Sequence, residues 1–152
     1  MKPLTLIHTI VVTALGTAFT AQADVVTDWN SAALNAIRTT RMPPPRASRN
    51  LAILHASIYD AVNGIQQTHK PYFVQGAGPE GTSIEAAANA AAHKALLALF
   101  PAQATGFDSL GSNTLASIPE GQAKTDGIAW GESVAGEILA WRATDGSDTA
   151  VD

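Results

Sequence analysis

Three residues at one helical spacing could carry acid–base or nucleophilic chemistry. His55, Tyr59 and Asn63 follow one another every four positions, which stacks them along one edge of a helix. An imidazole there could act as a nucleophile, a general base or a metal ligand. It could equally be a hydrogen-bonded residue beside the core. No second histidine stands at the spacing of a helical metal site, so we predict no metal site and keep His55 as a catalytic candidate.

Arginines gather just before this histidine. Arg38, Arg41, Arg46 and Arg49 lie close together, the last two at a predicted helix N-terminus, where free amides and the helix dipole favour anions. The cluster could bind a phosphate-like anion or a substrate carboxylate, with Arg46 as a binding candidate and Arg49 as a catalytic candidate. The alternative is a solvated elbow whose arginines pair with surface acids.

Two other stretches resemble motifs but lack their setting. The sequence GESVA at 131–135 nearly matches the GxSxG nucleophile elbow. That elbow needs a strand, a turn and a helix, whereas this serine falls inside a predicted helix. The sequence DGSD at 145–148 resembles part of a calcium loop without the other ligands or the closing glutamate. We interpret it as a turn.

The element that must position the candidates runs from Pro43 to Ile65. It opens with three consecutive prolines, which are expected to block helix formation before the rest of the stretch. Apolar residues then recur at helical spacing and predict one buried face. These residues are Ala47, Leu51, Leu54, Ile58, Ala61, Val62 and Ile65. We expect this segment to be the central helix of the fold.

Four more helices are predicted around it. One covers 26–37, with Thr27 or Asp28 as its N-cap. An alanine-rich helix covers 82–100, where TSIE at 82–85 predicts a capping box opened by Thr82. A shorter helix is expected around 107–115, and a fifth at 122–142. In the fifth, Gly127 and Gly131 lie one turn apart and predict close helix packing.

The first 23 residues predict a signal peptide. Lys2 precedes an apolar run, and the small residues of AQA at 21–23 suit a cleavage site. The helical domain is then 24–152, and the protein is expected to be secreted or periplasmic, without a membrane anchor after cleavage. An uncleaved anchor is the alternative, although the apolar run is short and carries polar residues.

Composition limits the function further. The chain has 152 residues, no cysteine, and 9 basic against 13 acidic residues. Cleavage of the predicted signal peptide would remove one basic residue, Lys2, and no acidic residue. The remaining chain would have 8 basic residues and a net charge of 8 − 13 = −5. An acidic chain is a poor general binder of nucleic acid, because that binding depends on neutralising phosphates. The lack of cysteine excludes thiolate catalysis and a disulfide framework.

Two stretches together resemble a known family. DVVTDWNSAALNAIRTTRMPPPRASRNLAILHASIYDAVNGI at 24–65 and GIAWGESVAGEILAWRATDG at 127–146 are similar to the N-terminal helical portion of bacterial vanadium-dependent haloperoxidase-like proteins. These belong to the type 2 phosphatidic acid phosphatase superfamily. The resemblance implies an exported all-helical enzyme. Its pocket would hold vanadate for halide oxidation with peroxide, or phosphate for hydrolysis by a histidine nucleophile.

The pocket motifs of that family are largely missing here. No Arg-Pro and no Ser-Gly-His occurs in the sequence, so no residue can be assigned to those motifs. The third motif is Ser-Arg with a histidine six residues past the arginine. Its one echo is Ser48-Arg49 with His55, and Asp60 stands one position later than the family's aspartate. In the family this motif comes last, whereas here it comes early.

The sequence therefore predicts an all-α bundle of about five helices. We expect it to be the N-terminal scaffold of an exported haloperoxidase-like or phosphatase-like enzyme, inactive and without bound vanadate when alone. Its expected partner is a missing C-terminal catalytic portion or a second copy. The alternatives are a non-enzymatic secreted module for packing or interaction, and a small anion-binding protein centred on Arg46 and Arg49.

Overall fold

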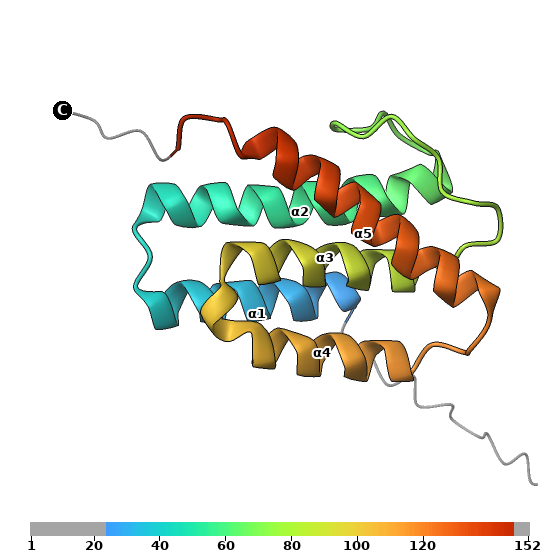
Figure 1. Ribbon diagram of the computed structural model, residues 1–152, viewed down its shortest axis with the longest axis horizontal. Coiled ribbons are helices and arrows are strands. Elements are labelled where there is room, and N and C mark those ends of the chain that lie inside the picture. Colours follow the sequence, from blue (N-terminus) through green and yellow to red (C-terminus); the bar gives the residue numbers. More distant parts are fainter. Residues whose placement is uncertain (1–23, 148–152) are drawn as a thin grey trace, which may run out of the picture.

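The computed structural model describes residues 24–147 and confirms the all-α class. Its five α-helices and one 3-10 turn follow one another as a bundle (Figure 1). They are α1 (Val25–Thr40), α2 (Pro44–Gln66), α3 (Ile84–Leu99), η1 (Pro101–Gln103), α4 (Ala104–Ala116) and α5 (Gln122–Arg142). No strand occurs within the described residues. The predicted signal peptide at 1–23 and the last five residues lie outside them.

The central helix of the bundle is α3. It packs against each of the other four helices, whereas α2 has its main contacts with α3 and α5. In Figure 1, α3 runs through the middle, with α2 and α5 on one side and α1 and α4 on the other. The expectation that the 43–65 segment is central was therefore wrong, because apolar periodicity marks a buried face and not the number of neighbours.

Small side chains allow α3 to take this position. Seven alanines of α3 are buried, together with Asn89 and Leu96. Neighbouring helices can approach closely because alanine adds little beyond the backbone. A Cβ atom at Gly127 of α5 would lie 2.6 Å from the Ser83 carbonyl oxygen, and one at Gly131 would overlap the carbonyl oxygen of Ala87. The predicted close packing along the glycine positions of α5 is confirmed.

Two helix starts differ from the prediction. Asp24, and not Thr27 or Asp28, is the N-cap of α1, and its carboxylate accepts the Val26 amide at 3.3 Å. Ser83, and not Thr82, is the N-cap of α3 and accepts the Ala86 amide at 3.2 Å. The Thr82 hydroxyl instead donates to the Pro79 carbonyl at 2.6 Å. With Ser83 as the N-cap, position N3 is Ala86 and not Glu85, so the predicted capping box was wrong.

The core divides into two clusters on either side of α3. The first surrounds Trp29 and Phe107 and joins α1, α2, α3 and α4, and the second surrounds Val134 and Ile138 and joins α2, α3 and α5. Trp29, Leu54, Val134 and Ile138 are completely buried. Both clusters lie mainly between described helices, and the second also contains Val74 of the segment between α2 and α3. Within that part, no helix is both long enough and apolar enough to cross a membrane.

Candidate functional site

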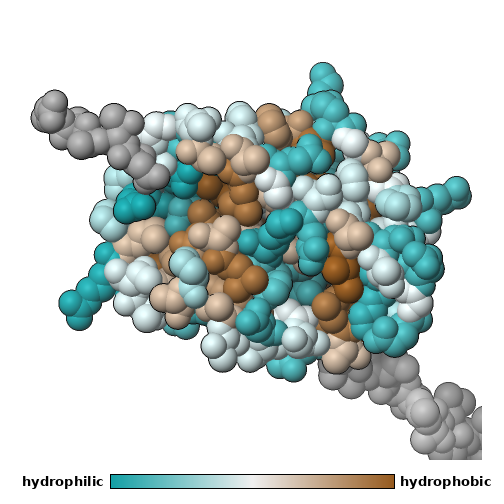
Figure 2. Space-filling model, in the orientation of Figure 1, coloured by the Kyte–Doolittle hydropathy of each residue, from teal (hydrophilic) through white to brown (hydrophobic). Residues whose placement is uncertain are grey.

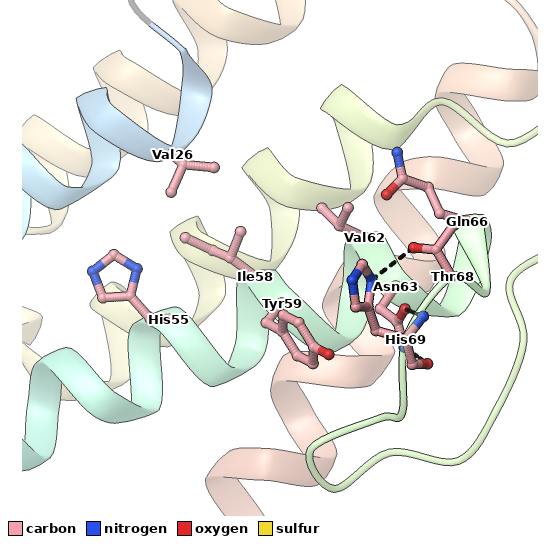
Figure 3. Close-up of a pocket in the computed structure, with 9 residues that line it drawn as sticks. All are labelled: Val26, His55, Ile58, Tyr59, Val62, Asn63, Gln66, Thr68 and His69. Carbon is pink, nitrogen blue, oxygen red and sulfur yellow. Dashed lines mark hydrogen bonds between the residues drawn. The ribbon is translucent and has the colours of Figure 1, made fainter.

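A groove lies between the start of α1, the second half of α2 and the segment that follows α2. Its volume is about 450 Å³. Val26 of α1 and Ile58 and Val62 of α2 are its apolar residues (Figure 3). Polar side chains also line it, namely His55, Tyr59, Asn63, Gln66, Thr68 and His69. The groove therefore combines an apolar surface with the candidate residues of the predicted helix edge.

The two histidines of this groove are held apart. The His55 ring lies at one end, with Nε2 3.0 Å from Oδ1 of Asn30 on α1. His69 lies at the opposite end in Figure 3, where its Nδ1 is 2.8 Å from the Thr68 hydroxyl. The two imidazoles do not form a pair. Within the described residues, no group of three or more histidine, aspartate or glutamate side chains could hold a metal ion.

Tyr59 and Asn63 bind the backbone of the segment after α2. The Tyr59 hydroxyl donates to the Lys70 carbonyl at 2.9 Å. The Asn63 side chain donates to the His69 carbonyl and accepts the His69 amide, each at 2.9 Å. Both side chains thus have partners that fix a loop, and such contacts use the polar atoms that catalysis would need. The predicted common helix edge is confirmed, and two of its three residues, Tyr59 and Asn63, hold the loop in place.

Asp60 also binds this loop, and it is the residue whose burial requires hydrogen-bond donors most. Its side chain is 1% exposed, and its carboxylate accepts the amides of Tyr72, Phe73 and Val74 at 2.6, 2.8 and 2.9 Å. A buried carboxylate needs such donors, because burying an unsatisfied charge is costly. In the sequence, Asp60 stands out only as part of a partial motif. Its partners lie in a loop without periodicity, so no sequence signal indicated them.

The same loop also encloses Trp130 of α5. The indole nitrogen donates to the Ala61 carbonyl at 2.9 Å. Cβ atoms added at Gly76 and Gly78 would lie 3.0 Å and 3.3 Å from the Trp130 ring, and one at Gly64 would overlap it. The glycines therefore let the loop and α2 approach the indole ring. The segment between α2 and α3 contains no helix or strand, but its contacts make it a support between α2 and α5.

Arg49 has partners at the end of α5. Its Nε donates to Oδ2 of Asp145 at 2.8 Å, and its Nη2 donates to the Arg142 carbonyl at 2.8 Å. Arg142 donates to the same Asp145 oxygen at 2.8 Å. The bond from Arg49 holds the pKa of the Asp145 carboxyl well below its usual range, and Ser147 acts in the same direction. The tail turn predicted around Asp145 is thus tied to α2.

The catalytic candidates do not form one cluster. Arg49 and His55 are six positions apart, so they point to different sides of α2. Arg49 meets the end of α5, whereas His55 meets Asn30 of α1. Arg46 is exposed in the first turn of α2 and does not line the groove. Oxyanion binding of the expected kind needs several converging donors, and these three residues do not converge on the groove.

The structure also places the serine of the GESVA stretch and shows an ion pair that the sequence did not indicate. Ser133 lies inside α5 and is exposed, so the GESVA stretch lacks the strand and turn of a nucleophile elbow, as predicted. His93 of α3 lies with its Nε2 2.8 Å from Oδ1 of Asp108 on α4. This pair was missed, because its residues are on separate helices. The Asp108 side chain is 58% exposed, which makes this a surface ion pair when the histidine is protonated.

Comparison of the chain with protein-family models, curated proteins and solved structures gives no match. The likeness to haloperoxidase-like proteins therefore rests on the residue pattern alone.

Proposed function

We propose that this chain is a helical scaffold, the N-terminal portion of an exported enzyme of the vanadium-dependent haloperoxidase-like or acid-phosphatase-like kind. The proposal rests on the resemblance of 24–65 and 127–146. On its own, the scaffold binds no vanadate and has no activity. Its task is to present a rigid helix surface to the portion that carries the oxyanion pocket.

One observation supports a scaffold above all. The polar side chains of α2 bind backbone groups of the fold: Tyr59, Asp60 and Asn63 hold the loop at 69–74, and Arg49 holds the last turn of α5. A nucleophile or an oxyanion ligand must instead keep its polar atoms directed at a substrate. The densest polar region of the chain is therefore used for architecture.

Identification of the native protein tests this proposal. Antibodies against the chain should detect a longer exported polypeptide that binds vanadate, and mass spectrometry should place peptides of this chain at its N-terminal end. A native product that contains only this chain, and that is folded and stable, would contradict the proposal.

The alternative is a non-enzymatic secreted module that interacts with a partner through its helices. Both core clusters are formed by described residues of the helices and of the segment between α2 and α3, which favours an independent unit. Figure 2 also shows two apolar surface patches separated by hydrophilic residues on one face, a feature typical of interaction surfaces. Sedimentation equilibrium would distinguish the scaffold hypothesis from the interaction-module hypothesis. A module predicts a defined oligomer or complex, whereas an exposed scaffold surface predicts progressive self-association.

A further inference from the structure

The contact between α2 and the end of α5 contains more hydrogen-bond donors than acceptors. Arg49 and Arg142 both donate to one oxygen of Asp145, each at 2.8 Å. The other oxygen accepts the Ser147 amide of the same turn at 3.1 Å. Nε of Arg142 is buried without a partner, which holds for no other buried side-chain nitrogen or oxygen in the described part. Two guanidinium groups thus share one carboxylate.

An apolar hollow of about 100 Å³ adjoins this contact. Its walls come from α2, from α5 and from Tyr72 of the loop. The lining residues are Ala52, Ile53, Ala56, Tyr72, Ile138, Trp141 and Arg142. The Tyr72 and Trp141 rings meet edge to face with centroids 5.9 Å apart. Tyr72 is 61% exposed, so the aromatic wall is open to solvent.

Arg142 belongs to both features, since it lines the hollow and donates to Asp145. The hollow therefore presents apolar and aromatic surface beside a cation that has a spare donor. Ligand sites commonly combine mostly apolar walls with a few polar groups that fix the orientation of the ligand. An enclosed apolar cavity of roughly 150 Å³ binds benzene. This hollow of about 100 Å³ is smaller but open on the side of Tyr72, so it can hold part of a small organic group while the rest stays in solvent.

We propose that Arg49, Arg142 and the hollow form a binding site for a small monocarboxylate with an apolar or aromatic body. In the free chain, the Asp145 side chain occupies the position of the ligand carboxylate. Binding exchanges one carboxylate for another on the two guanidinium groups, so no net charge is buried. The apolar body of the ligand would enter the hollow, which Asp145 does not fill.

Asp145 makes the wild-type site weak. A tethered competitor acts at an effective concentration on the order of millimolar. A free carboxylate must compete with it, and removal of the Asp145 charge should relieve that competition. The short turn from 143 to 147 contains no buried residue, so it is the Asp145 contacts that hold it against α2. A ligand carboxylate that replaces these contacts would release the turn. This inference does not depend on the proposed scaffold function.

Titration with sodium benzoate, followed by the arginine Nε–H signals in two-dimensional NMR, tests the site. Asp145→Asn in the full chain should bind benzoate at least tenfold more tightly than the wild type, and acetate much more weakly than benzoate. The matched control Asp126→Asn, on the surface of α5, should match the wild type. A folded Asp145→Asn chain whose arginine signals do not move with benzoate would overturn the proposal.

Further variants keep the test independent of how Asp145→Asn folds. In the wild type, benzoate should shift the Ser147 amide signal, because Ser147 donates to Asp145. Arg142→Gln should abolish benzoate binding, while Arg38→Gln on α1 should not. Ala52→Leu, at an exposed position of the hollow, should remove the preference for benzoate over acetate. Equal benzoate affinity in Arg142→Gln and the wild type would overturn the proposal.

Discussion

Single residues of α2 decide how the segment after this helix is held. Asp60 gathers three consecutive amides from residues 72–74 inside the protein. Asn63 binds the backbone of His69 through both its amide nitrogen and its oxygen. Hydrogen bonds to a charged group are the strongest of this kind. Asp60 is therefore the residue on which the loop between α2 and α3 depends most.

Replacement of Asp60 by asparagine tests this role. The variant keeps the shape of the side chain but turns one acceptor oxygen into a donor that faces backbone amides. We expect the free energy of unfolding to fall by about 2 to 4 kcal/mol, measured by chemical denaturation. Asp126→Asn is the control. Its carboxylate accepts one exposed bond from Gln122, so its effect should stay below about 0.5 kcal/mol. Equal effects would refute the assigned role.

The contribution of Asp145 should depend on pH. Arg49 lowers its pKa in the folded chain, below the value of about 3.9 expected when unfolded. A lowered pKa stabilises the fold fully above the unfolded value, and this stabilisation is lost as the pH falls towards the folded pKa. The difference in unfolding free energy between wild type and Asp145→Asn should therefore be constant at neutral pH and shrink below about pH 4. A difference that persists unchanged in acid would contradict this assignment.

At this scale, the sequence could show which residues share a helix edge but not what they bind. The spacing of His55, Tyr59 and Asn63 predicted their common side of α2, which the groove confirms. Their partners lie on α1 and in an aperiodic loop, and no local pattern indicates such contacts. Asp145 was interpreted as part of a simple turn. Arg142 is only three positions away, but Arg49 becomes a partner only when α2 and α5 pack together.

Among the elements, the contact between α3 and α5 sets how closely the helices approach. Gly131→Ala should destabilise the protein by about 2 to 3 kcal/mol, because the added methyl group overlaps the Ala87 carbonyl oxygen. Gly106→Ala is the matched control in α4, where a Cβ meets nothing within 4 Å. It should be neutral or stabilising by up to about 1 kcal/mol. Thermal unfolding of both variants provides the comparison, and a neutral Gly131→Ala would disprove the close contact.

Most of the fold at this scale could be predicted from periodicity and breakers. Only Pro43 lies outside α2. Pro44 and Pro45 were expected to block the helix but form its first turn, where proline is tolerated because no amide donor is needed there. The fifth helix covers the predicted residues. The prediction failed for the position of α3. Alanine contributes little to an apolar stripe, so an alanine-rich helix gives a weak sign of being central. Its burial follows from how little space it needs between four neighbours.

Across the whole molecule, polar side chains join separate elements of the fold. Arg49 joins α2 to the end of α5, Asp60 joins α2 to the loop, and Trp29 joins α1 to α3 through Asn89. These ties run between elements that are far apart in the sequence. They support a rigid scaffold more than a reactive pocket.

The most direct test is a calorimetric titration of the purified chain with orthovanadate and with phosphate, after circular dichroism has shown that it is helical. The proposed scaffold predicts no saturable heat with either anion, because Asp145 engages Arg49 and the other candidates do not converge. Micromolar binding that is lost in Arg49→Ala or His55→Ala would contradict the account. It would show that the first half of α2 is an oxyanion site in its own right.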